Sequence, residues 1–211
     1  MDSEKDIFML IDGSAIVHRA YHAMPPFTTS AGVPTGAVSG FFSMLLKLIQ
    51  QLKPAYIVIA FDRPKPTFRQ QLYVGYQSQR PKMEADLSEQ FKGIIDILDA
   101  AKIVQIGVDG YEADDIIGTL SASANKQGIF TYIVTGDRDM LQLVDQDTLV
   151  LMPIKGISEV KLHDEESVKA NYGVKPAQMV DLKALTGDAS DNYPGVAGIG
   201  PKTAANLIAE Y

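Results

Sequence analysis

The sequence of 211 residues contains no cysteine, which excludes disulfide bonds and metal sites built from thiolates. It contains no apolar run that approaches the ~20 residues of a membrane-spanning helix. The N-terminal stretch "MDSEKD" is charged and mostly acidic, and only the short run "IFMLI" follows it, so no secretory signal is visible. These absences predict a soluble, cytoplasmic protein with no membrane partner.

Basic residues are in the minority, with 19 lysines and arginines against 26 aspartates and glutamates and a formal net charge of -7. Taken alone, this balance argues against a partner as acidic as DNA. The distribution of the charges points the other way. Residues 63–83 contain no acidic residue and five basic ones, namely Arg63, Lys65, Arg69, Arg80 and Lys82.

Apolar segments with the character of buried strands alternate with amphipathic helical segments along most of the chain. Ser88 is expected to cap one of the helices. Strands that alternate with helices predict an α/β fold with a mostly parallel sheet covered on both faces. Strands are predicted within 6–12, 55–62, 102–108, 130–137 and 148–152, and helices over 36–52, 87–101 and from the "EADD" stretch to about 126.

Two segments fall outside this alternation and define the predicted domains. Residues 63–86, rich in Arg, Lys, Gln, Tyr and Pro, are expected to form a mobile or helical excursion over the sheet. Residues 164–211 contain short helical segments separated by glycines. We therefore predict an α/β domain over 1–163 and a small helical appendage over 164–211.

Acidic residues follow the predicted strands. Asp12, Asp62 and Asp137 lie at the ends of three strands, and the sequence "GYEADD" follows a fourth. Because the carboxyl ends of parallel strands meet at one edge of a sheet, these acids are expected to converge there. With acids from two later turns, the candidate set is Asp12, Asp62, Glu112, Asp114, Asp115, Asp137, Asp139, Asp188 and Asp191.

Carboxylates gathered in one crevice repel one another, since two like charges 4 Å apart cost about 4 kcal/mol at an effective dielectric constant near 20. Protonation relieves part of this repulsion, and Mg²⁺ or Mn²⁺ relieves it better because both ions prefer oxygen ligands. Each acid alone has an ordinary explanation as a turn residue or a helix cap. The joint pattern favours a site for Mg²⁺ or Mn²⁺ that holds two or more ions.

The basic excursion suits phosphodiester chemistry, in which bound ions activate water and basic side chains hold the nucleic-acid backbone. Tyr76 is a candidate for stacking on an unpaired base, whereas Tyr73 is expected to pack beneath the excursion. In the appendage, the stretch "GVAGIGPKT" is either an ordinary turn between helices or a phosphate contact. The second reading places Lys202 and Thr203 beside free N–H groups at a helix start.

The chain resembles the 5′-nuclease domain of bacterial DNA polymerase I and the related flap endonucleases in five stretches: "LIDGSAIVHRAYHAMPPFTTSAGVPTGAV", "FDRPKPTFR", "GYEADDIIGTL", "VTGDRDMLQLV" and "LTGDASDNYPGVAGIGPKTA". The resemblance implies a PIN-like sheet, a helical arch at about 63–86 and a helix-hairpin-helix subdomain. It also implies a 5′→3′ exonuclease and 5′-flap endonuclease of replication and repair. Its substrates would be DNA with flaps, nicks or 5′ ends, and RNA–DNA primer junctions.

The resemblance also implies roles for individual residues. Arg19, Arg69 and Arg80 match basic positions near the scissile phosphate, Tyr76 matches the stacking aromatic, and Lys82 is expected to contact phosphate. The hairpin that includes Gly198, Gly200, Lys202 and Thr203 would grip duplex DNA and hold a K⁺ ion. The first metal group would contain Asp12, Asp62, Glu112, Asp114 and Asp115, and the second Asp137, Asp139, Asp188 and Asp191.

Two features depart from the family pattern. The arch of the family reads Tyr-Lys-x-x-Arg, whereas "YQSQR" places the neutral Gln77 at the lysine position, so Arg80 or Lys82 would have to supply the charge. The chain stops at Tyr211, inside the expected second hairpin helix, so the appendage is expected to be truncated. A monomeric state and a polymerase module on the same native chain are further expectations.

Three other interpretations remain open from the sequence. A branched-DNA-binding module of the same fold would have lost turnover through Gln77 or through the shortened appendage. An RNA-cleaving PIN nuclease is disfavoured because minimal PIN domains lack a segment like "GDASDNYPGVAGIG". A metal phosphatase for small esters would leave the basic excursion and the hairpin without a purpose.

Overall fold

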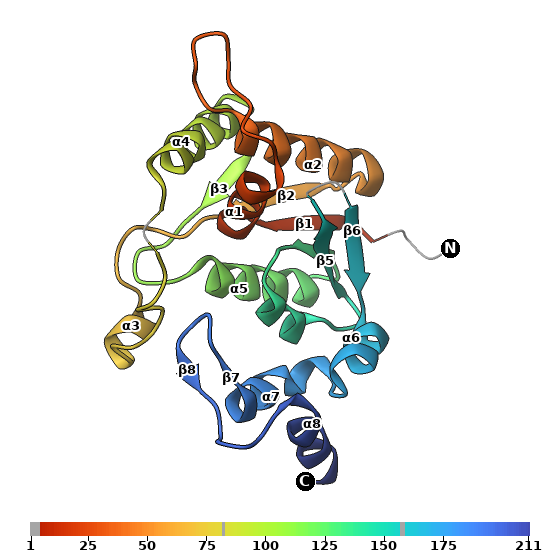
Figure 1. Cartoon of the computed structure of the whole chain (residues 1–211). Helices are drawn as coiled ribbons and strands as arrows, with labels where there is room; N and C mark the ends of the chain where they lie inside the picture. Colours follow the sequence, from red (N-terminus) through yellow and green to blue (C-terminus); the bar gives the residue numbers. More distant parts are fainter. Residues whose placement is uncertain (1–4, 82, 157–158) are drawn as a thin grey trace.

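The computed structural model describes residues 5–81, 83–156 and 159–211. Within them, six strands form one sheet in the order β3-β2-β1-β4-β5-β6. Strands β1 to β5 are parallel and β6 runs antiparallel to β5, which confirms the mostly parallel sheet (Figure 1). The bounds are β1 (Ile7–Asp12), β2 (Tyr56–Ala60), β3 (Val104–Ile106), β4 (Phe130–Val134), β5 (Thr148–Lys155) and β6 (Glu159–His163).

Helices cover both faces of the sheet, and strand β1 shows how the two layers arise. Successive side chains of a strand point to opposite faces, so Met9 and Ile11 enter one core and Phe8 and Leu10 enter the other. The first core contains α1 (Gly13–Ala23), α2 (Gly36–Leu52) and α4 (Ala85–Ala100), and the second contains α5 (Ala113–Lys126), α6 (Glu165–Tyr172), α7 (Met179–Thr186) and α8 (Pro201–Glu210).

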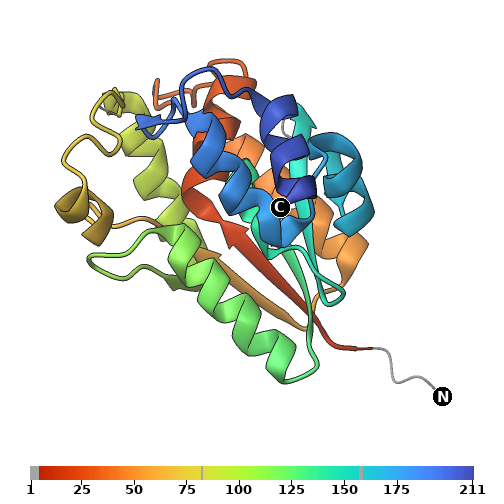
Figure 2. The same ribbon diagram turned by 90° about the horizontal axis from the view of Figure 1, so that it is seen from below.

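The appendage is built onto the sheet domain and shares its second core. Val168 of α6, Leu182 of α7 and Ala204 of α8 are buried in the cluster that also contains the β1 and β5 side chains. In Figure 2, helix α5 (green) and helices α7 and α8 (blue) lie on the same side of the sheet. None of the helices in the described part of the chain combines the length and apolarity of a membrane span.

Several expectations about local structure need correction. The sequence reasoning missed α1 and β6, although it gave α2 its observed bounds. Ser88 is not a cap, because α4 begins at Ala85 after Glu84. The described part of 63–84 contains turns and one short helix, α3 (Phe68–Leu72), and residues 85 and 86 belong to α4. Other short elements are the 3-10 helices η1 (Arg138–Leu143) and η2 (Pro176–Gln178) and the two-stranded pair β7 (Gly187–Asp188) and β8 (Tyr193–Pro194).

Helix α1 follows β1 without a connecting loop, and this junction depends on Gly13. Asp12 is both the last residue of β1 and the N-cap of α1, where its Oδ1 accepts a hydrogen bond from the Ala15 N–H at 2.9 Å. A Cβ atom on Gly13 would lie 2.2 Å from the ring of Phe61. The close approach of the Phe61 ring therefore requires glycine at the residue that follows Asp12.

Substituting Gly13→Ala is expected to lower the free energy of unfolding by about 1–3 kcal/mol, because the ring of Phe61 must move within a packed core. Urea unfolding of the two proteins measures the difference. Gly118→Ala is the matched control, since the added Cβ would meet only Leu143 at 3.7 Å, and alanine is favoured within a helix. An unchanged midpoint for Gly13→Ala would show that the junction tolerates a side chain.

Candidate active site

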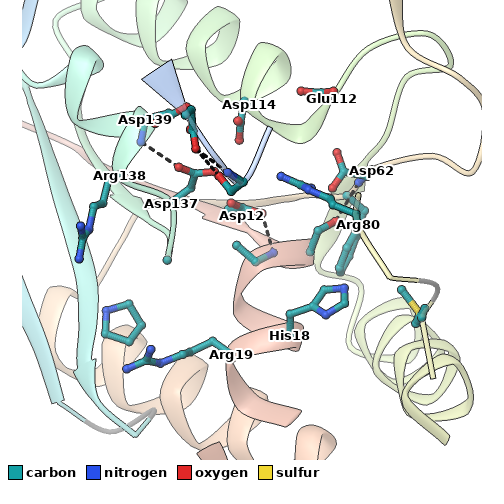
Figure 3. Close-up of a pocket in the computed structure, with 18 of the residues that line it drawn as sticks. Asp12, His18, Arg19, Asp62, Arg80, Glu112, Asp114, Asp137, Arg138 and Asp139 are labelled. Carbon is teal, nitrogen blue, oxygen red and sulfur yellow. Dashed lines mark hydrogen bonds between the residues drawn. The ribbon is translucent and has the colours of Figure 1, made fainter. Parts of the chain in front are cut away.

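A cavity of about 1770 Å³ opens at the carboxyl edge of the sheet. Strands β2 and β3 extend from β1 in one direction and β4 and β5 in the other, so the edge beside β1 and β4 is a topological switch point. Ligands of open α/β sheets bind at such points. Figure 3 shows Asp12, Asp114, Asp137 and Asp139 gathered on one side of this cavity.

Asp12 lies at the centre of the site and is only 3% exposed. Its second oxygen, Oδ2, accepts a hydrogen bond from the Thr135 hydroxyl at 2.8 Å, in addition to the bond from Ala15. Burial raises the pKa of Asp12 to about 7, and the charges of Asp62 and Asp137 add to the rise. The carboxylate is thus held in one orientation in a place that disfavours its charge.

Asp114, in the first turn of α5, has neither a hydrogen-bond donor nor a cationic partner in the part of the chain that the structure describes. Burial raises its pKa to about 9, with further contributions from the carboxylates of Asp12 and Asp137. Within the described residues, no N–H or O–H group donates to the Asp114 carboxylate and no cation pairs with it. Asp62, by contrast, accepts a hydrogen bond from the Ala113 N–H at 2.8 Å.

A second group of carboxylates comprises Asp139, Asp188 and Asp191, each with one oxygen within 4.8 Å of the others. Lys183 of α7 forms ion pairs with Asp139 and Asp188. Partial burial alone would raise the pKa of Asp188, but hydrogen bonds from Lys183 and Ser190 lower it to about 2. With Arg80 paired to Asp191, protein cations therefore balance part of the charge of the second group.

Asp115 is separated from the rest of its predicted group, and Glu112 lies between the two cavities. The Asp115 carboxylate forms two hydrogen bonds with the guanidinium of Arg69, at 2.7 and 2.8 Å. Asp115 lines a second cavity of about 860 Å³ and is absent from the lining of the first. Glu112 lines both cavities and accepts hydrogen bonds from the hydroxyls of Thr67 and Tyr76.

Asp137 provides the link between the two groups. The resemblance assigns it to the second group, but its charge acts on both Asp12 and Asp114 of the first. Its Oδ1 also accepts a hydrogen bond from the Asp139 N–H at 2.8 Å. The structure therefore brings seven of the nine predicted acids to the lining of the main cavity. Asp191 lines the second cavity but has an oxygen within 4.8 Å of oxygens of Asp139 and Asp188, and Asp115 is turned toward Arg69.

The predicted phosphate-binding arginines all have partners within the protein. Arg19 donates to the backbone oxygens of Gly156 and Ile154 at 3.1 and 3.2 Å, and Arg80 pairs with Asp191 at 3.0 Å. Arg69 is held by Asp115, and its pKa is raised by that hydrogen bond. Lys82 lies outside the described residues.

The basic excursion is docked on the loop that carries Asp191. Gln77 donates from its side chain to Asp191 at 3.0 Å, and Asn192 donates to the Gly75 carbonyl at 2.9 Å. The rings of Tyr73 and Tyr193 stack with their centroids 5.2 Å apart, which confirms a packing role for Tyr73. Tyr76 is only 6% exposed, so it has no free face for a nucleobase in this arrangement.

The hairpin glycines in the appendage have distinct geometries. Gly198 adopts a left-handed φ of 83°, and Gly200 is the N-cap residue of α8. Lys202 and Thr203 are exposed in the first turn of that helix. The predicted start of a helix at Pro201 is confirmed, and a phosphate or K⁺ contact there stays a prediction.

Two family models match the chain, and their descriptions are "5'-3' exonuclease, N-terminal resolvase-like domain" for residues 7–173 and "5'-3' exonuclease, C-terminal SAM fold" for 174–211. The chain belongs to the 5′-3′ exonuclease family. The two matches meet ten residues beyond the predicted boundary at 163, because the first includes α6. The domain division at 163/164 stays a prediction.

Curated relatives of the family resemble the chain over almost its whole length. It is 41% identical over 202 residues to the 5'-3' exonuclease of Aquifex aeolicus, covering 96% of this chain and 68% of the relative. It is 42% identical over 209 residues to DNA polymerase I of Bacillus subtilis, covering 99% of this chain and 24% of the relative. The chain thus spans about a quarter of the length of the DNA polymerase I relatives.

Solved structures of bacteriophage T5 5′-exonuclease share the fold. One, with bound zinc ions, gives a TM-score of 0.77 at 22% identity and covers 97% of this chain and 75% of the other. A T5 flap endonuclease complex with DNA and metal ions has the same scores. These similarities confirm the predicted PIN-like architecture for the exonuclease chain described here.

Sequence reasoning missed several residues of this exonuclease site. His18 lines the cavity from α1, and it was missed because α1 itself was not predicted. Arg138, between Asp137 and Asp139, lines the same cavity, and Figure 3 shows its side chain pointing away from those carboxylates. The position of Arg138 between two predicted metal ligands could have identified it as a residue of the site. Lys183 could not have been identified in this way, because the sequence does not show which acidic residues a lysine on a predicted helix will contact.

Proposed function

We propose that this chain is a divalent-metal-dependent 5′ nuclease that hydrolyses phosphodiester bonds of DNA. The observation that carries the proposal is Asp114, a partly buried carboxylate that has no donor among the described residues and that four other carboxylates act on. Oxygen donors in this arrangement suit Mg²⁺ or Mn²⁺. Family membership and the similarity to nucleases that bind metal ions and DNA support the same conclusion.

The two carboxylate groups would hold separate ions. Asp12, Asp62, Asp114 and Asp137 line the main cavity and would hold the first, with Glu112 reaching it through water. Asp139, Asp188 and Asp191 have oxygens close enough together to hold the second. When bound, such ions supply an activated water and charge stabilisation for the leaving oxygen.

The protein itself would orient the DNA. Arg80 and Arg19 line the cavity opposite or beside the carboxylates, where they would bind the phosphate that is cut and its neighbour. Gln77 cannot provide the charge of the lysine usual at this position. Arg80 reaches the same carboxylate from the same segment, so we assign it the electrostatic role. Arg69, Lys82 and the docked Tyr76 would contact DNA after the excursion moves.

The native substrates would be DNA with 5′ flaps, nicks or 5′ ends, and RNA–DNA primer junctions. The hairpin of Gly198, Gly200, Lys202 and Thr203 would grip the duplex by its backbone N–H groups, with a K⁺ ion held by backbone carbonyls. The similarity to DNA polymerase I supports a native setting in replication and repair beside a polymerase module.

The test is a cleavage assay on 5′-labelled flap, nicked and single-stranded oligonucleotides, with Mg²⁺, with Mn²⁺ and with a chelator. Cleavage is expected only with a divalent ion, most rapidly on flapped and nicked DNA, and with 5′-phosphate and 3′-hydroxyl products. Metal-supported binding without any cleavage would reject the nuclease. It would favour the alternative of a branched-DNA-binding module.

A further inference from the structure

The two carboxylate groups differ in how their negative charge is balanced. Among the described residues, Asp114 at the centre of the first group has no cationic partner. In the second group, Lys183 pairs with both Asp139 and Asp188, and Arg80 pairs with Asp191. A divalent ion would therefore find free acceptors at the first group and occupied ones at the second.

Lys183 contacts the same carboxylates that would hold the second ion. It lies in the last turn of α7, one turn before Asp188, and its Nζ bridges one oxygen of Asp139 and one of Asp188. Because the three carboxylates of this group have oxygens within 4.8 Å of one another, an ion bound by all three would lie where the ammonium group now is. Two cations cannot share that position.

We propose that Lys183 competes with the second divalent ion, so that its ammonium group must leave Asp139 and Asp188 before the ion can bind all three carboxylates. This proposal depends on the proposed function at one point, the assignment of these carboxylates to a metal ion. Lysine suits the role because its charge lies at the end of a flexible four-carbon chain. The side chain lines both cavities, so it has space to move without unwinding α7.

The competition makes a quantitative prediction for Lys183→Met, which keeps the length of the side chain and removes its charge. The second ion should bind about 10- to 100-fold more tightly, the range expected from removing hydrogen bonds between charged groups. The first ion should bind with nearly unchanged affinity, since Lys183 pairs with neither Asp12 nor Asp114.

The experiment is a Mn²⁺ titration without DNA, in which electron paramagnetic resonance measures the free ion for the wild type and for Lys183→Met. Lys169→Met, a change at an exposed lysine of α6, controls for the loss of a positive charge. Adding Asp188→Asn to Lys183→Met should abolish the gain. Lys183→Gln provides a second variant, and circular dichroism verifies that each protein is folded.

A nuclear magnetic resonance measurement follows the displacement directly. In protein labelled with ¹⁵N, the ammonium signal of Lys183, assigned by its loss in Lys183→Met, should lose its hydrogen-bond shift as Mg²⁺ saturates the second group. A signal that Mg²⁺ leaves unchanged would contradict displacement.

The outcomes separate this proposal from the proposed function. An unchanged or weaker second ion in both Lys183 variants would overturn the proposal, as would the absence of Mn²⁺ binding in every protein. A gain of the expected size, in protein that cuts no DNA, would support the competition and reject the nuclease. Tighter binding in Lys169→Met as well would show a general charge effect and would also overturn it.

Discussion

Replacing Asp114 by asparagine is expected to lower the rate of flap cleavage by about 10³-fold or more. The reason is that asparagine keeps the shape of the side chain but removes a carboxylate that interacts with the charges of Asp12 and Asp137. Charge stabilisation by a bound ion is worth several kcal/mol in phosphodiester hydrolysis, and about 4 kcal/mol corresponds to about 10³ in rate. Single-turnover cleavage of a 5′-flap substrate measures this effect.

The same substitution should stabilise the metal-free protein at pH 8 by several kcal/mol. Burial raises the pKa of Asp114 to about 9, so folding requires either a buried charge or a retained proton, and asparagine requires neither. Urea unfolding in the presence of a chelator measures the gain. A variant that loses cleavage and also loses stability would indicate a structural role for Asp114 in place of a metal-binding one.

Asp115→Asn is the matched control, one residue further along the same helix. The resemblance assigns Asp115 to the first metal group, but the structure pairs its carboxylate with Arg69. We expect cleavage within about tenfold of the wild type and a stability loss of about 1–3 kcal/mol, because the Arg69 guanidinium loses two charged hydrogen bonds and keeps only its longer ion pair with Glu112. Equal losses of cleavage in both variants would place Asp115 among the metal ligands.

The convergence of the acids could be predicted from the sequence, because it depends only on the pattern of apolar residues that marks the strands. The buried strands before Asp12, Asp62 and Asp137 are plain in the hydrophobic pattern, and parallel strands carry their carboxyl ends to one edge. Helix α1 and strand β6 were missed although the sequence carries a signal for each: Asp12 caps α1, and Gly156, with a left-handed φ of 61°, lies in the turn before β6.

The orientation of neighbouring carboxylates could not be predicted from the sequence. Asp114 and Asp115 are adjacent on α5, about 100° apart around the helix axis, so only the surroundings decide which one faces the cavity. The pairing of Arg69 with Asp115 decides the orientation. Arg69 belongs to the excursion 63–86, and the path of that segment could not be predicted because its sequence has no periodic apolar pattern. The pairing of Lys183 with Asp139 and the docking of Tyr76 against Tyr193 depend likewise on tertiary contacts.

The stability of the metal-free protein is expected to fall as the pH rises from 6.5 to 9. Two acids, the buried Asp12 and the partly buried Asp114, set the direction, because their pKa values in the folded state, about 7 and about 9, lie above the ordinary value of 3.8. In this range the unfolded chain has released both protons, whereas the folded protein still retains that of Asp114. Stability must therefore fall with pH.

The slope follows from the number of protons retained. Each proton held only by the folded protein lowers the free energy of unfolding by about 1.4 kcal/mol per pH unit. Above pH 7, where Asp114 dominates, the total loss up to pH 9 is therefore about 3 kcal/mol. Below pH 6.5 two histidines partly offset this fall in the free energy of unfolding. Burial lowers the pKa of His18 and of His163, so their contributions to the free energy of unfolding rise with pH.

Mg²⁺ should reverse this dependence, because an ion binds the deprotonated carboxylates and competes with their protons. At a concentration 100 times its dissociation constant an ion adds about 2.7 kcal/mol, or about 5–10 °C in melting temperature for a chain of this size. The measurement is a series of thermal melts from pH 6.5 to 9 with chelator and with Mg²⁺. In the wild type we expect the difference between the melting temperatures with Mg²⁺ and with chelator to grow as the pH rises. In Asp114→Asn we expect this difference to shrink. A melting temperature of the metal-free protein that is constant or rises over this range would contradict the inference. It would show that the Asp114 carboxylate is solvated or paired. The charge that we infer attracts the ion to the site would then be absent.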